Sequence, residues 1–121
     1  MSKGLKTTFL LHAIVSLVIG LSLYLIPGVF VDLVNWTPFD PGMTQAFGAA
    51  LLAFCLSSFL AYRSGTYGDV KIIVQTEILL TILGALGSLY QVLFAGGPAF
   101  NWVSFVLFAV FGALFIIYRK G

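Results

Sequence analysis

Four long apolar runs, separated by short polar or glycine-containing connections, make up nearly the whole chain. Each run has close to the ~20 residues that a helix needs to cross a hydrocarbon core about 30 Å thick. The pattern therefore predicts four membrane-spanning helices in one domain, residues 1–121. We expect the spans at about residues 7–26, 43–62, 70–94 and 102–118.

The third run contains Glu77, the only charged side chain that lies well inside an apolar run. From Glu77 onward, small or polar residues follow at intervals of three or four, which places them on one face of a helix. They are Thr81, Gly84, Ser88 and Gln91. Exposing a charge to lipid is costly, so intramembrane charges face a bundle interior or a watery cavity. We therefore expect this polar face to point into a helix bundle.

The first run carries a second polar face, on which His12 and Ser16 lie one helical turn apart. A histidine inside a bilayer needs a polar partner. His12 and Glu77 each follow a lysine by six residues, which places both about 9 Å inside the same boundary of the membrane. The matched depth leads to the hypothesis that His12 and Glu77 form a pair.

The other two spans cross this level with small or hydroxyl-bearing residues. Counting six residues back from the arginine that ends each span gives Ser57, beside Ser58, and Ala113, beside Gly112. Three interpretations stay open: a hydrogen-bonded layer that sets helix register, a site for a ligand or lipid head group, and proton-linked transport or catalysis. The candidate binding residues are Glu77, His12, Ser16, Ser57, Ser58 and Thr81.

The cationic residues are distributed asymmetrically. All six Lys and Arg residues lie at the N-terminus, in the connection between the second and third runs, or at the C-terminus. By the positive-inside rule, both termini and the 63–71 connection are cytoplasmic. We therefore predict an all-α integral membrane four-helix bundle, N-in and C-in, with up-down-up-down topology, in a prokaryotic plasma membrane.

Composition argues against several classes of function. A chain with 60% hydrophobic and 8% charged residues has no room for a soluble domain or a nucleic-acid-binding patch, despite its net charge of +2. A metal or haem site needs more ligands than His12, Cys55 and Glu77 offer at unequal depths. Serine nucleophile chemistry would require a base beside Ser57 or Ser58, and no nucleophile motif surrounds them. We expect no catalytic residues, no metal and no cofactor.

Local signals predict how the later helices begin and pack. Asp40 followed by Pro41 predicts an N-cap with proline at the first helical position. Asp69 and Asn101 are placed to cap the third and fourth spans. The second span is rich in Gly, Ala and Ser, which predicts a helix packed against from several sides.

The helix stop at Pro27, the Asp40-Pro41 entry to a Gly/Ala-rich helix and the short Gly97-Pro98 turn are similar to features of the small four-helix DoxX-like membrane proteins. Within that group the chain most resembles a family of unknown function. Some DoxX-like proteins are associated with quinone-linked oxidase complexes. The resemblance therefore implies an accessory or quinone- or lipid-contacting role, and it carries no active-site residue with it.

Three functions fit these observations. The first is a non-enzymatic bundle that binds a small apolar or lipid-like ligand, such as a quinone, or a partner membrane subunit, at the internal polar layer. The second is a proton-coupled transporter that uses Glu77, and the third an accessory subunit of a quinone-linked oxidoreductase. Membrane lipids are the expected surroundings, and the small-residue surface favours a homodimer or a partner subunit.

Overall fold

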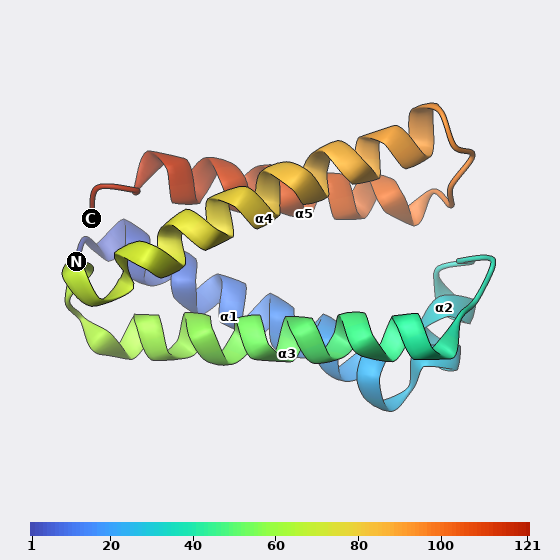
Figure 1. Cartoon of the computed structure of the whole chain (residues 1–121), viewed down its shortest axis with the longest axis horizontal. Coiled ribbons are helices and arrows are strands. Elements are labelled where there is room, and N and C mark those ends of the chain that lie inside the picture. The colour runs from blue at the N-terminus through green and yellow to red at the C-terminus, as the bar shows by residue number, and fades with distance from the viewer.

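The computed structural model describes all of residues 1–121 and consists of helices joined by short connections (Figure 1). Four of its five helices are long and apolar enough to cross a membrane. Each predicted span boundary lies within four residues of the observed one. The helices are α1 (Lys3–Leu25), α2 (Pro27–Leu33), α3 (Pro41–Ser64), α4 (Tyr67–Leu93) and α5 (Phe100–Ile117).

The predicted start of α3 is confirmed, because the Asp40 carboxylate accepts a hydrogen bond from the Met43 N–H at 3.1 Å and Pro41 is the first helical residue. The other two predicted caps are wrong. α4 begins at Tyr67, so Asp69 lies inside its first turn and accepts a hydrogen bond from the Ser64 hydroxyl. Both α4 and α5 begin before the polar residue that was predicted to cap them.

α5 likewise begins one residue before the predicted cap. Asn101 lies inside the first turn, and its side-chain amide donates to the Pro98 carbonyl at 3.1 Å. This hydrogen bond links the start of α5 to the preceding turn. Asn101 is buried although it lies next to a connection.

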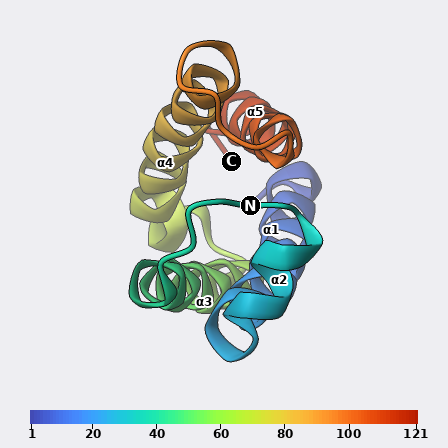
Figure 2. The same ribbon diagram turned by 90° about the vertical axis from the view of Figure 1, so that its right-hand side faces the viewer.

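The long helices form two pairs, α1 with α3 and α4 with α5, and the contacts between the pairs are few (Figures 1 and 2). Within the first pair the backbones approach closely. A Cβ atom at Gly48 of α3 would lie 2.9 Å from the Tyr24 nitrogen and 3.0 Å from the Gly20 carbonyl of α1. Small residues at such crossings allow the close packing that holds helices together in lipid.

The two pairs meet at one end of the molecule, which we call the terminal end because both chain termini lie there (Figure 1). Within the first pair, the Met1 amino group donates to the Gly65 carbonyl at 3.4 Å, and within the second pair, the Tyr67 hydroxyl donates to the Arg119 carbonyl. Large apolar side chains fill the space between the pairs here. This core consists of Leu5, Phe9, Ala61, Val70, Val74, Phe111 and Phe115.

At the opposite end, which we call the loop end, the pairs diverge (Figure 1). The short helix α2 and the residues after it lie at this end, and Figure 2 shows this segment passing in front of the space between the pairs. Edge-to-face aromatic contacts link it to α5. The ring of Phe100 lies 5.6 Å from that of Phe30 and 6.5 Å from that of Trp36, measured between centroids.

Within one chain, the small-residue helix α3 is not packed against from several sides. Along α3 only Gly48, Ser58 and Ala61 are buried. Because the pairs diverge, α3 packs closely on α1 and has few contacts with α4. Most of its small residues therefore lie on the outer surface.

Candidate functional site

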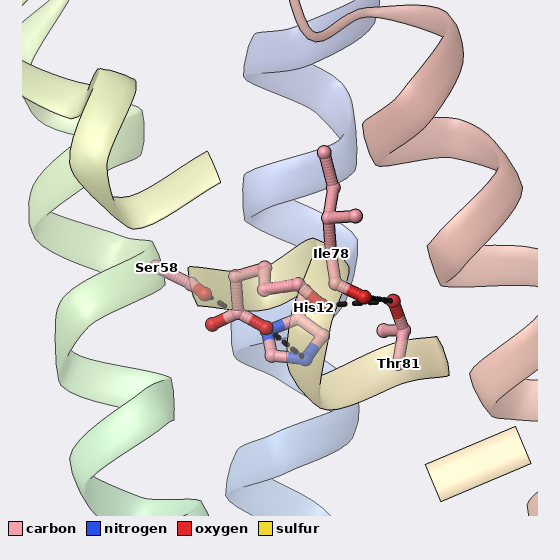
Figure 3. A network of polar contacts seen from close by, with 5 residues as sticks. His12, Ser58, Ile78 and Thr81 are labelled. Atoms are coloured by element: carbon pink, nitrogen blue, oxygen red, sulfur yellow. Dashed lines mark hydrogen bonds and ion pairs between the residues drawn. The ribbon is translucent and has the colours of Figure 1, made fainter. Parts of the chain in front are cut away.

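A polar layer joins three helices between the core of the terminal end and the wider loop end (Figure 3). His12 comes from α1, Ser58 from α3, and Glu77 from α4. His12 Nδ1 lies 2.8 Å from Ser58 Oγ, and His12 Nε2 lies 3.3 Å from Glu77 Oε2. The structure thus places the imidazole between a hydroxyl and a carboxyl group, as the matched depth of His12 and Glu77 predicted.

The Glu77 side chain is fully buried, yet neither of its carboxylate oxygens has a hydrogen-bond partner. The 3.3 Å approach of His12 Nε2 is an ion-pair distance, but it is longer than a typical N–H···O hydrogen bond. Buried polar groups are nearly always hydrogen-bonded, and those that are not call for a functional or structural reason. Glu77 is therefore the one side chain of the layer whose polar atoms are not satisfied.

His12 is the central group of the layer because each of its ring nitrogens has its own neighbour. A neutral imidazole can accept from Ser58 at Nδ1 while its Nε2–H faces Glu77, and a protonated one can donate to both. The rings of Phe111 and Phe115 pack edge-to-face on it, with centroids 5.0 and 5.7 Å away. The imidazole is thus held in one orientation by apolar and polar contacts together.

The base that serine chemistry would require is present beside Ser58, because His12 is within hydrogen-bond distance of it. The order Ser58, His12, Glu77 has the connectivity of a nucleophile, base and orienting acid. However, Ser58 is fully buried and lines neither of the two cavities described below. A substrate therefore has no access to its hydroxyl, and the contacts are those of an interhelical hydrogen-bonded layer.

The remaining predicted residues separate into buried and outward-facing ones. Thr81 is buried, and its hydroxyl donates to the Glu77 carbonyl at 2.8 Å, while Ser16 is buried one turn from His12. Ser57 is only half-buried and has no hydrogen bond to the layer, so the level uses its neighbour Ser58. On α5, a Cβ atom at Gly112 would lie 3.0 Å from Thr81 Oγ1, and Ala113 faces outward.

A cavity of about 290 Å³ extends from this layer toward the loop end between the two helix pairs. We call it the wedge cavity. At its inner end lie His12, Ser16 and Thr81, three of the predicted site residues. Glu77 and Ser58 do not line it. The other lining residues are mostly apolar: Val15, Ile19, Leu23, Phe30, Val31, Trp36, Met43, Thr44, Phe47, Leu51, Phe100, Ser104, Leu107, Phe108 and Phe111.

Sequence reasoning missed the aromatic wall of the wedge cavity, which includes Phe30, Trp36 and Phe100 near the mouth. In a membrane protein an aromatic residue can equally face lipid, core or cavity, so hydropathy does not separate these positions. One signal was available for Ser104, the only serine or threonine of the fourth apolar run. It lines the cavity on the α5 side.

Searches with this chain found no matching protein-family model, no matching curated protein and no matching solved structure.

Proposed function

We propose that this protein is a membrane-embedded binding protein for a small apolar molecule that carries one hydrogen-bonding group. The observation that supports this most directly is the wedge cavity, which is mostly apolar along its length and ends on His12, Ser16 and Thr81. Ligand sites typically combine apolar walls with a few convergent polar groups that set orientation. The apolar body of the ligand would lie toward the loop end, and its polar group would contact the layer.

The size of the cavity restricts the class of ligand. A volume of about 290 Å³ lies at the lower end of the range for small-molecule sites. It suits a short aliphatic alcohol or a small quinone ring better than a whole phospholipid. A carbonyl oxygen is a good match for the inner end, because the Ser16 hydroxyl can donate a hydrogen bond to it. The Thr81 hydroxyl already donates to the Glu77 carbonyl, and the two ring nitrogens of His12 face Ser58 and Glu77.

We further propose that the terminal end lies in the cytoplasm and the loop end outside, in a prokaryotic plasma membrane. The six cationic residues support this orientation, since all lie at the termini or in the α3–α4 connection. α1, α3, α4 and α5 would then span the membrane up-down-up-down. A ligand would then reach the wedge cavity from the outer leaflet or the outer surface. The resemblance to DoxX-like proteins stays a prediction.

The alternative of proton-coupled transport by Glu77 has less support. Transport requires access to a site from both sides of the membrane in turn. On the terminal side of Glu77 lie Phe9, Val74 and Phe115, all essentially inaccessible to solvent. A transporter would have to separate these packed side chains, whereas a binding protein needs only the existing cavity.

A binding experiment with three probes of graded polarity tests the proposal. The purified protein in detergent micelles would be titrated with a short-chain benzoquinone, with decanol and with decane, and occupancy read by native mass spectrometry. We expect the quinone and decanol to bind and decane to bind more weakly, because decane offers nothing to the polar inner end. No saturable binding of any of the three would contradict the proposal.

A matched pair of variants on α5 locates the site. Ser104→Leu adds bulk inside the wedge cavity, whereas Ala109→Leu adds bulk at an exposed position of the same helix. The leucine side chain would overlap with the volume that the bound ligand occupies. Such overlap costs about 1–3 kcal/mol, so Ser104→Leu should weaken ligand binding about tenfold or more. Ala109→Leu should bind as the original chain does. Equal affinities for the two variants would place the ligand elsewhere.

A further inference from the structure

A second hollow, separate from the wedge cavity, lies at the terminal end. The start of α4 and the residues after α5 are both at this end (Figure 1). The volume of the hollow is about 330 Å³. We call it the basic groove. It is lined by Tyr67, Lys71, Val74, Gln75, Ile78, Arg119 and Lys120.

The basic groove concentrates positive charge. It contains Lys71, Arg119 and Lys120, half of the six cationic residues of the chain. Its lining includes none of the four Asp and Glu residues. The only ion pair in the structure is that of His12 with Glu77. An anion entering the groove would therefore meet three cations without displacing an existing partner.

The groove is held in shape by contacts that leave its cationic groups available. The Tyr67 hydroxyl donates to the Arg119 carbonyl, which fastens the chain after α5 against the start of α4. One guanidinium nitrogen of Arg119 donates to the Ile116 carbonyl at 2.7 Å. The other N–H groups of the guanidinium stay free, and guanidinium groups match phosphate geometry well.

The groove also has an apolar side. Lys71, Gln75 and Ile78 follow one face of α4, so a cation, an amide and an alkyl side chain succeed one another along the helix. Val74 borders the groove on its inner side. A free phosphate ion would use only the cationic part, whereas an amphiphile would place its phosphate on the cations and its alkyl part along Ile78.

We propose that the basic groove binds the phosphate of an anionic phospholipid head group. Clusters of Lys and Arg next to transmembrane helices attract anionic lipids, and basic pockets between helices bind their head groups. This site does not depend on the function of the wedge cavity, since the two share no lining residue. Lipid bound here would anchor the ends of α4 and α5 to each other.

The test compares two triple variants that remove the same charge. Lys71→Gln with Arg119→Gln and Lys120→Gln empties the groove of cations. Lys3→Gln with Lys6→Gln and Arg63→Gln removes the other three, all exposed outside the groove. The proteins would be extracted in mild detergent and offered dioleoylphosphatidylglycerol or dioleoylphosphatidylcholine, and bound lipid counted by native mass spectrometry. Thermal unfolding of each variant would verify that it is folded.

We expect the original chain and the second triple variant to retain one phosphatidylglycerol in preference to phosphatidylcholine. The groove variant should lose this preference, by about fivefold for each cation removed. An equal loss in both variants would overturn the proposal, because the effect would then follow total charge. Competition by 10 mM inorganic phosphate separates the two sources of phosphate: displacement of the lipid by the free ion would overturn the assignment to a lipid.

Discussion

The space between the two helix pairs is filled at the terminal end and hollow at the loop end, although apolar side chains line it at both. At the terminal end, Phe9 and Phe115 pack edge-to-face with ring centroids 5.4 Å apart and are fully buried. At the loop end, Phe47 and Phe100 border a cavity of about 290 Å³. The difference indicates that one end holds the pairs together and the other is available for a ligand, with the polar layer between them.

The largest expected effect is the loss of a core ring at the terminal end. Phe9→Ala should lower the free energy of unfolding by about 3–5 kcal/mol, the usual range for deleting a buried phenylalanine. Phe47→Ala removes the same atoms from a side chain that is 48% exposed, so it should cost about 1 kcal/mol or less. Unfolding in mixed micelles titrated with dodecyl sulfate measures both. Similar losses would contradict the division between the two ends.

A smaller effect is expected where the two helices of one pair touch. Gly48→Ala places a Cβ atom against the backbone of α1, which cannot move aside as a flexible side chain can. We expect a loss of about 1–3 kcal/mol in the free energy of unfolding. The result would show that α1 and α3 are closely packed on each other, although a cavity opens between the two pairs.

The control for this glycine is Gly87→Ala on α4, where an added Cβ atom meets nothing within 4 Å. This variant should be neutral or more stable by up to about 1 kcal/mol, because alanine favours the helix more than glycine does. If Gly48→Ala were as well tolerated as Gly87→Ala in the same unfolding titration, the close approach of α1 and α3 would be wrong.

The smallest effect belongs to the polar layer. Ser58→Ala removes the hydroxyl that contacts His12 Nδ1, and interhelical hydrogen bonds in membranes contribute about 0.6 kcal/mol on average, with measured values up to about 1.7. The matched control is Ser57→Ala, which makes no contact with the layer and should change the free energy of unfolding negligibly. If Ser57→Ala lowered the free energy of unfolding more than Ser58→Ala does, the serine of the polar layer would be Ser57 and not Ser58.

Much of the helical arrangement could be predicted from local sequence. The four apolar runs have the length of membrane spans, and the structure has four long apolar helices within four residues of the predicted ends. Asp40 and Pro41 mark the start of α3 as predicted. The predictions that Asp69 and Asn101 are N-caps were wrong. Any Asp or Asn near a helix start is a candidate cap, and residue type does not determine the first helical residue to within one or two positions.

The candidate site could be predicted only in part. A three- or four-residue spacing placed Thr81 and Ser88 on the buried face of α4 with Glu77, because lipid penalises polar side chains on the outer face. Depth counting brought His12 and Glu77 to one level. It could not choose between Ser57 and Ser58, since neighbouring residues differ by only about 1.5 Å in depth but point 100° apart around the helix.

Hydropathy and residue spacing predict that polar groups avoid lipid, and hence which helix faces turn inward and at what depth. They do not predict that α1 pairs with α3 and α4 with α5, that the pairs meet at the terminal end, or that a cavity remains at the loop end, all of which depend on packing in the folded chain. The reason is physical. Lipid tails, a packed core and a dry cavity are all apolar, so hydropathy is the same for Phe9 in the core and Phe100 at the cavity, and only packing distinguishes them.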